Sequence, residues 1–199
     1  MRRAFALTLT ALIVTGCATT LTVAPPTAEL QQKFADRDRE LAALNRWSFT
    51  GRIAVQATND GWSGTIHWDQ LDQNYSVDIR GPVGTGTARL TRTEQGSELR
   101  LSDERLFTGR DARALLVEHL DLDLPVDTLQ LWMIGRLNPT LEKSYELDDS
   151  GRLLRLRQSD WDIEYKRYTH VGKLDLPEKI FAHNAHAQFR LFVDEWSTQ

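Results

Sequence analysis

The sequence has little sulfur and no hydrophobic run long enough to cross a membrane. Cys17 is the only cysteine among 199 residues, so the chain has no partner for an intramolecular disulfide. The apolar stretch at residues 4–14 is shorter than the ~20 residues that a membrane-spanning helix needs. A disulfide-stabilised scaffold and a helical membrane-spanning protein are therefore both excluded.

An excess of positive charge is also lacking. The formal net charge is −4, from 24 Lys and Arg against 28 Asp and Glu. Removal of Arg2 and Arg3 with an N-terminal signal changes it by two charges, from −4 to −6. A mildly acidic body with charges of both signs disfavours nucleic acid as the partner. It equally disfavours electrostatic docking on anionic lipid.

Catalytic and metal-binding constellations are absent from the sequence. Residues 61–64, Gly-Trp-Ser-Gly, lack the last glycine spacing of a hydrolase nucleophile elbow. His183 and His186 have no cysteine and no carboxylate cluster beside them, which disfavours a metal site. His67 falls on the polar face of an expected strand, and no phosphate-binding glycine loop precedes a helix. We therefore expect no enzyme activity, no metal and no cofactor.

The N-terminus carries the sequence of a secretory signal. Two arginines precede the apolar run, and small residues lead to Gly16 and Cys17, as at a signal-peptide cleavage site. A small residue before a lone cysteine resembles the bacterial lipobox, in which the cysteine is acylated and becomes the mature N-terminus. Ala18 follows Cys17 in place of the Asp that retains lipoproteins in the inner membrane, so the resemblance implies the outer membrane. The alternative is an ordinary signal peptide with an incidental cysteine.

The remaining chain predicts one mainly β domain of the α+β kind. Residues 1–16 are the expected cleaved signal, residues 17–26 an acylated tether with two prolines, and residues 27–199 a single domain. Thr27 is placed to cap an amphipathic helix. From Trp47 the hydrophobic period changes to two, and short strands follow at the spacing of an antiparallel barrel or sandwich.

Two helices interrupt the expected strands. Asp111 is placed to cap the first, and Asp127 to cap a second at residues 128–134 that Gly135 ends. The second helix is apolar nearly all round, so it must cover something or be covered. The tryptophans on apolar faces either fill a core or line a cavity, and the sequence leaves both open: Trp47, Trp62, Trp68, Trp132 and Trp161.

Four stretches together resemble the LolB family of outer-membrane lipoprotein receptors of Gram-negative bacteria. They are the lipobox at Cys17, the strand with Gly51, the Gly-Pro-Val-Gly turn at residues 81–84, and the segments 129–135 and 145–153. The last two are similar to the lid helix and following hairpin of the family. The turn departs from the family pattern, since Val83 stands where Leu is usual and Gly81 replaces a polar residue.

The resemblance implies an unclosed antiparallel barrel with an N-terminal helix and a helical lid over a hydrophobic cavity. It further implies acylated lipoprotein cargo, the periplasmic carrier LolA as donor, and release into the inner leaflet of the outer membrane by a monomer. Val83, an apolar residue at a turn tip, becomes the candidate for membrane insertion. The residues expected at the acyl-chain cavity and its lid are Ile66, Trp68, Leu131, Trp132, Met133, Ile134 and Leu147.

Two functional hypotheses follow. The first is a non-enzymatic lipoprotein receptor with a cavity for acyl chains, held at the outer membrane through Cys17 with its body in the periplasm. The second is a structural or assembly lipoprotein with a filled core and a protein-binding surface. A lipid hydrolase is disfavoured because no nucleophile–base pair is visible.

Overall fold

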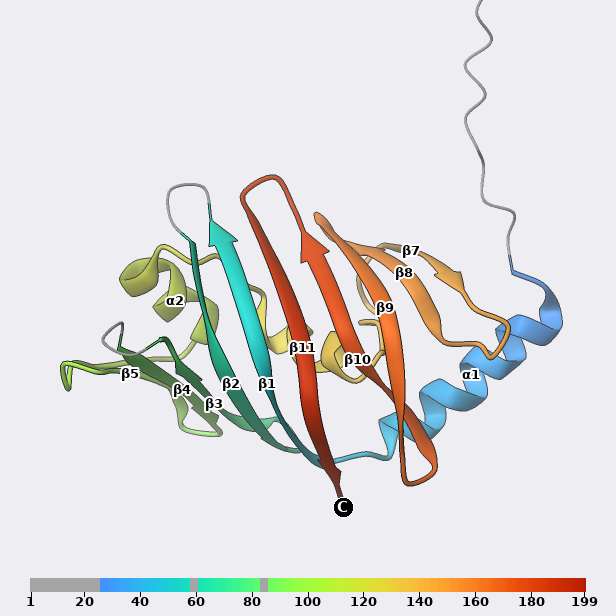
Figure 1. The fold of residues 1–199 in the computed structure, drawn as a ribbon, viewed down its shortest axis with the longest axis horizontal. Helices are drawn as coiled ribbons and strands as arrows, with labels where there is room; N and C mark the ends of the chain where they lie inside the picture. Colours follow the sequence, from blue (N-terminus) through green and yellow to red (C-terminus); the bar gives the residue numbers. More distant parts are fainter. Residues whose placement is uncertain (1–25, 58–60, 83–85) are drawn as a thin grey trace, which may run out of the picture.

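A computed structural model describes residues 26–57, 61–82 and 86–199. Its centre is an 11-stranded sheet with the order β6-β5-β4-β3-β2-β1-β11-β10-β9-β8-β7. Neighbouring strands are antiparallel throughout, and β6 and β7 form the two edges. The sheet curves around the helices without closing (Figure 1). The expected mainly β, unclosed antiparallel architecture is confirmed.

The strands follow the predicted order along the chain. The first six form a meander, and β1 also pairs with β11, so the first and the last strand lie side by side in the middle of the sheet. Their bounds are β1 Arg46–Ala57, β2 Gly61–Leu71, β3 Asn74–Arg80, β4 Thr87–Thr93, β5 Gly96–Leu101, β6 Leu106–Gly109, β7 Lys143–Leu147, β8 Leu153–Gln158, β9 Trp161–Val171, β10 Leu174–His183 and β11 Ala187–Thr198.

Helix α1 spans Ala28–Ala42 and begins as predicted, because the Thr27 side chain accepts a hydrogen bond from the amide of Leu30. It lies beside β7–β10 at one end of the sheet (Figure 1). Phe34 stacks on Tyr145 with 5.1 Å between ring centroids, and Leu41 is buried. The helix therefore belongs to the β7–β11 half of the molecule.

Helices α2 (Ala112–Leu120) and α3 (Val126–Met133) lie together on the concave side of the sheet (Figure 1). Asp111 caps α2 as predicted, accepting from the amide of Arg113. The prediction that Asp127 caps α3 is wrong, since the helix begins two residues earlier, at Val126, and its N-cap is Pro125. Asp127 instead lies in the first turn, where its charge is favourable to the helix dipole.

Gly135 ends α3 as predicted. Its φ of +77° is a left-handed conformation that glycine adopts without strain. The amide of Gly135 donates to the Trp132 carbonyl, and the amide of Arg136 donates to the Leu131 carbonyl. This is the paired hydrogen bonding of a Schellman motif, which satisfies carbonyls at the helix end.

Strand alternation places most of the expected apolar residues on the concave face. In β2, Ile66 and Trp68 are buried while Thr65 and Asp69 are exposed. In β8 the alternation is irregular: Leu154 is 42% exposed, although Leu156, two residues further along the strand, is buried, and Leu153 is buried as well. The register between β7 and β8 shifts at Leu147, and a bulge of this kind changes which residues face the core.

Gly51 occupies a bulge in the pairing of β1 with β11. The register shifts between Thr50 and Gly51, and a Cβ atom built on Gly51 lies 2.3 Å from the carbonyl oxygen of Phe192. Because that contact is with backbone, no side-chain rotation relieves it. The glycine at this position is thus required by the close approach of two strands at the centre of the sheet.

Candidate functional site

An apolar cavity lies under α2 and α3 against the concave face of β1–β5 and β11. Its volume is about 610 Å³, within the range of small-molecule binding sites. Side chains from the strands form the floor, among them Ile53, Val55, Ile66, Trp68, Val77, Ile79, Leu90, Leu99, Phe189 and Leu191. The cavity is therefore a gap between sheet and helices that their side chains do not fill.

The segment from α2 to α3 forms the roof. Leu116 and Leu120 of α2, then Leu122 and Leu124 of the connecting segment, line the cavity. One stripe of α3 completes it, with Val126, Leu129 and Met133 at helical spacing. The sequence predicts a helix after Asp111 but assigns none of these leucines to the cavity, so their place in its wall is an addition from the structure. The sequence does carry a sign of this role, because the five leucines at positions 115, 116, 120, 122 and 124 are more than one face of the nine-residue helix α2 can bury.

Polar side chains gather at one end of this cavity. They are Ser63, Thr87, Ser102, Asp103 and Arg105. Ser63 and Thr87 lie at the starts of β2 and β4, and the other three lie in the β5–β6 turn. The antiparallel order brings these positions to the same end of the sheet, toward the left and top of Figure 1. The cavity is thus apolar within and polar at one mouth.

The β5–β6 turn is held by the pair of Asp103 and Arg105. Arg105 Nε donates to Asp103 Oδ2 at 2.6 Å, and the amide of Arg105 donates to Asp103 Oδ1 at 3.2 Å. The hydrogen bond from the guanidinium lowers the pKa of the Asp103 carboxyl. Arg105 also lies 5.8 Å from the ring centroid of Phe107. The mouth therefore presents an ionised carboxylate and a guanidinium side by side.

Helix α2 contacts the sheet mainly through apolar and aromatic surface. The ring of His119 stacks on Phe107 of β6, with 3.6 Å between centroids. Leu115 lies over Gly109, where an added Cβ would be 3.3 Å from its side chain. Within the described residues, Arg113 pairs with Asp123, in the connection that follows the helix, and lowers the pKa of that carboxyl.

Helix α3 is tied to the sheet by polar contacts at both ends. Near its start, Asp127 accepts from the Tyr75 hydroxyl at 3.3 Å and from Arg92 at 3.1 Å. Gln130 accepts from the buried Gln70 at 2.7 Å. Burial of Tyr75 and the adjacent Asp127 charge raise the pKa of its hydroxyl, so Tyr75 acts here as a neutral donor.

The far end of α3 is fixed to the β7–β11 half. Trp132 Nε1 donates to Gln158 Oε1 at 3.0 Å, and the Tyr165 hydroxyl donates to the Trp132 carbonyl at 3.1 Å. Burial raises the pKa of the Tyr165 hydroxyl well above its usual range. Arg136, just beyond the helix, makes two hydrogen bonds to Asp38 of α1.

The structure separates the residues expected at the cavity and lid into two groups. Ile66, Trp68 and Met133 lie on the cavity wall. Trp132 is 1% exposed and turned away from it, with its ring 6.1 Å from that of Trp161. Leu131, Ile134 and Leu147 are not among the lining residues, and Ile134 is buried in the core. Cys17 and Val83 lie outside the described residues.

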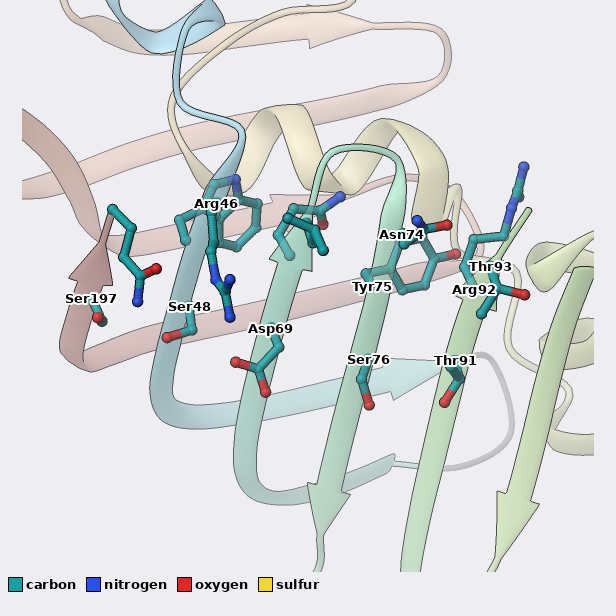
Figure 2. A pocket seen from close by; sticks show the side chains of 14 residues that line it. Arg46, Ser48, Asp69, Asn74, Tyr75, Ser76, Thr91, Arg92, Thr93 and Ser197 are labelled. Carbon is teal, nitrogen blue, oxygen red and sulfur yellow. The ribbon is translucent and has the colours of Figure 1, made fainter. Parts of the chain in front are cut away.

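A second hollow of about 380 Å³ lies at the opposite end of the strands (Figure 2). Pairing across the sheet aligns Ser197, Ser48, Asp69, Ser76 and Thr91 in one row. Figure 2 shows these side chains along the strands. They alternate with Trp68 and Val77, whose side chains line the apolar cavity. Trp47, Gln70 and Tyr75 also line the hollow, which shares no lining residue with the apolar cavity.

The described residues offer no metal-binding cluster and no membrane-spanning helix as an alternative to the cavity. Among residues 26–57, 61–82 and 86–199 there is no group of three His, Cys, Asp or Glu side chains placed to hold a metal ion. The His67 ring pairs with Asp69 at 2.8 Å on the convex face. None of the described helices is long and apolar enough to cross a membrane. The apolar cavity is therefore the candidate functional site.

Two solved structures resemble this protein in fold. They are a DUF1329 family protein from Desulfovibrio piger (TM-score 0.54, 7% identity, covering 87% of this chain and 94% of that one) and a LolA superfamily protein from Nitrosomonas europaea (TM-score 0.53, 11% identity, 85% and 93%). At these identities the likeness concerns the fold alone.

Sequence relatives are more specific. The outer-membrane lipoprotein LolB of Nitrosococcus oceani is 34% identical over 173 residues, 86% of each chain. That of Pseudomonas aeruginosa strain PAO1 is 33% identical over 165 residues, 83% of this chain and 80% of the relative. A family model described as outer membrane lipoprotein LolB matches residues 45–196. Because the match spans the strands and both helices that enclose the cavity, the protein belongs to the LolB family of outer-membrane lipoproteins.

Proposed function

We propose that this protein is an outer-membrane-anchored receptor that accepts lipoproteins from the periplasmic carrier LolA. It holds their acyl chains in the apolar cavity and inserts them into the inner leaflet of the outer membrane. The observation that carries the proposal is the cavity of about 610 Å³ between α2–α3 and the strands β1–β5 and β11 in a chain of the LolB family. A structural lipoprotein with a filled core has no need of such a space.

The physical chemistry of the cavity suits acyl chains. Each CH₂ group moved from water to an apolar site contributes about 0.8 kcal/mol, and the floor and roof of the cavity are aliphatic and aromatic. Transfer to a bilayer exchanges one apolar environment for another, so it requires no nucleotide. Direction comes from the order of affinities: the receptor must bind acyl chains more strongly than its donor, and the bilayer takes them from the receptor.

The anchor is proposed at Cys17, with the signal removed before it and the body facing the periplasm. One acyl chain alone binds a membrane only reversibly, whereas several give stable anchoring. Mass spectrometry of the mature N-terminus tests this: an acylated Cys17 is expected, and an unmodified Cys17 or cleavage elsewhere contradicts the anchor.

A cavity-binding assay tests the receptor function. We expect a neutral apolar fluorophore, N-phenyl-1-naphthylamine, to bind saturably to the protein lacking its lipid anchor, and an acylated peptide to displace it. The same peptide without acyl chains is the control. Failure of the acylated peptide to compete would favour the structural alternative.

Val83 is proposed to enter the membrane during delivery. Burying a valine side chain gains about 1.5 kcal/mol, which is enough for a transient contact because Cys17 holds the protein at the surface. We expect Val83→Glu to accept cargo from the carrier but fail to deliver it to liposomes, and Val83→Leu to deliver at least as well as the wild type. Equal loss of acceptance and delivery would contradict this role.

A further inference from the structure

The cavity has polar side chains at one end only, which restricts the kind of ligand that fits it. Ser63 and Thr87 begin two strands, and Ser102, Asp103 and Arg105 occupy one turn beside them. A ligand that enters with its apolar part inward leaves its polar part at this end. The site thus matches an amphiphile with one polar head, and the chemistry of the mouth indicates which head.

We propose that the Asp103–Arg105 pair at the cavity mouth binds the backbone N–H and C=O of the acylated cysteine of the cargo. This inference rests on the proposed receptor function and adds to it a head-group site. In an extended chain, the N–H donor and the C=O acceptor of one residue point to the same side. Arg105 supplies N–H donors and Asp103 supplies acceptor oxygens side by side, with Arg105 Nε and Asp103 Oδ2 2.6 Å apart, so the pair complements both groups of one residue.

The positions of the two side chains support this role. Both side chains are about half exposed, Asp103 at 52% and Arg105 at 61%, yet both line the cavity. A pair in this position has donors and acceptors left over after its own hydrogen bonds, because a guanidinium carries five N–H groups and a carboxylate about four acceptor sites.

The turn itself holds these residues at the mouth. Glu104, between them, has a φ of +66°, a left-handed conformation that turns the chain sharply. The Glu104 amide donates to the Leu101 carbonyl, and the Leu101 amide donates to the Arg105 carbonyl. Gly86, in the connection before β4, approaches so closely that a Cβ there would lie 2.7 Å from the Ser102 hydroxyl. The head-group site is therefore built on backbone fixed by hydrogen bonds and close packing.

Competition binding with two ligands of matched chains tests the proposal. The probe is N-phenyl-1-naphthylamine, and the competitors are a synthetic Cys-Ser-Lys peptide with an S-dipalmitoylglyceryl group and an acetylated N-terminus, and dipalmitoylglycerol, which has the same two chains but no peptide. For Arg105→Ala we expect the lipopeptide to bind about tenfold more weakly and dipalmitoylglycerol to change less than twofold. Asp103→Asn keeps one acceptor oxygen and should show a smaller loss, again for the lipopeptide alone.

Arg100→Ala is the matched control. Arg100 is the neighbouring arginine of β5, is 53% exposed and pairs with Glu98 as Arg105 pairs with Asp103, but it does not line the cavity. Its loss should leave both ligands unchanged. Equal weakening of lipopeptide binding by Arg100→Ala would overturn the proposal, because a general loss of positive charge would then account for the effect.

The same experiment distinguishes failure of the head-group site from failure of the receptor function. Unchanged lipopeptide affinity in Arg105→Ala overturns the head-group site while the receptor function stands. Absence of wild-type binding to either competitor overturns the receptor function itself. A third competitor, dipalmitoylphosphatidylglycerol, distinguishes a lipid phosphate: if Arg105→Ala weakens its binding and leaves the lipopeptide unchanged, the mouth binds a phospholipid head and the proposal is wrong.

Discussion

The two helices on the concave face are held in different ways. Helix α3 makes polar contacts to β2, β3, β4, β8 and β9, and the residue that follows its C-terminal turn pairs with α1. Helix α2 rests on β5 and β6 through Leu115, Leu116 and the stack of His119 on Phe107. Polar contacts require specific geometry, whereas apolar contacts tolerate sliding. The comparison indicates that α3 is a fixed part of the core and α2 is the cover of the cavity.

The two halves of the sheet also differ, because one is packed as core and the other borders the cavity. On the concave side of β8–β10, Leu156, Ile163, Leu176 and Ile180 are at most 1% exposed and belong to the same buried core as Trp132 and Trp161. Under α2, the corresponding face of β2–β5 borders the cavity. One half of the curved sheet thus stabilises the fold, and the other half keeps space for a ligand. Substitutions in the two halves should therefore change different measurements.

The largest expected effect is on stability and comes from Trp132→Ala. Removing a buried aromatic side chain costs about 3–5 kcal/mol of unfolding free energy, and the Oε1 atom of Gln158 loses one donor. Chemical denaturation measures the loss. The affinity of the folded protein for N-phenyl-1-naphthylamine should stay the same, because Trp132 faces away from the cavity.

For Leu120→Ala we expect the reverse of Trp132→Ala: a change in probe binding and little change in stability. Leu120 lines the cavity and is 39% exposed, so the substitution should weaken probe binding severalfold and change stability by less than about 1 kcal/mol. If Trp132→Ala weakened binding and Leu120→Ala did not, the assignment of cover and core to α2 and α3 would be reversed.

Hydrogen exchange should show the difference between α2 and α3 in the wild-type protein, without any substitution. Amides of α2 are expected to exchange through local opening at least tenfold faster than those of α3, a difference of about 1.4 kcal/mol, because fewer specific contacts must break. Mass spectrometry of peptides covering residues 112–120 and 126–133 measures this. Saturating acylated peptide should slow α2 more than α3. Equal exchange rates of α2 and α3 in the protein without ligand would contradict the proposed difference between the two helices.

A smaller effect is expected from the ion pairs at the two helices. Arg136 and Asp38 are 19% and 34% exposed and make two hydrogen bonds, so a double-mutant cycle to alanine should give a coupling of about 1 kcal/mol. Arg113 and Asp123, at 54% and 49% exposed, should give at most about 0.5 kcal/mol. A larger coupling in the second pair would mean that α2 is held as specifically as α3.

The smallest expected effect concerns acid stability. A hydrogen bond from His170, with the charges of Arg152 and Arg37, lowers the pKa of Asp175. Its stabilising contribution is therefore present above the unfolded pKa of about 3.9 and is lost as the pH falls through the lower folded value. Asp175→Asn should flatten the fall in stability below about pH 4. Denaturation midpoints between pH 2 and 6 measure it, and an unchanged acid slope would contradict it.

Much of the fold follows from local sequence. Strand alternation, the Thr27 and Asp111 caps and the Gly135 stop each depend on neighbouring residues, and the structure contains them all. The cap assigned to Asp127 is wrong because its carboxylate is used by Tyr75 and Arg92, which are more than thirty residues away. Local rules cannot anticipate a partner that only the folded sheet brings near.

The sequence by itself determined that a chain with alternating apolar residues would form an antiparallel sheet and that an apolar helix would either cover another element or be covered. Only the tertiary structure decided which of the apolar residues face a cavity. Trp68 and Trp132 are equally apolar and equally buried, yet one lines the cavity and the other fills the core. The reason is physical: hydrophobicity drives both side chains out of water, whereas an empty space depends on how far sheet and helix stand apart.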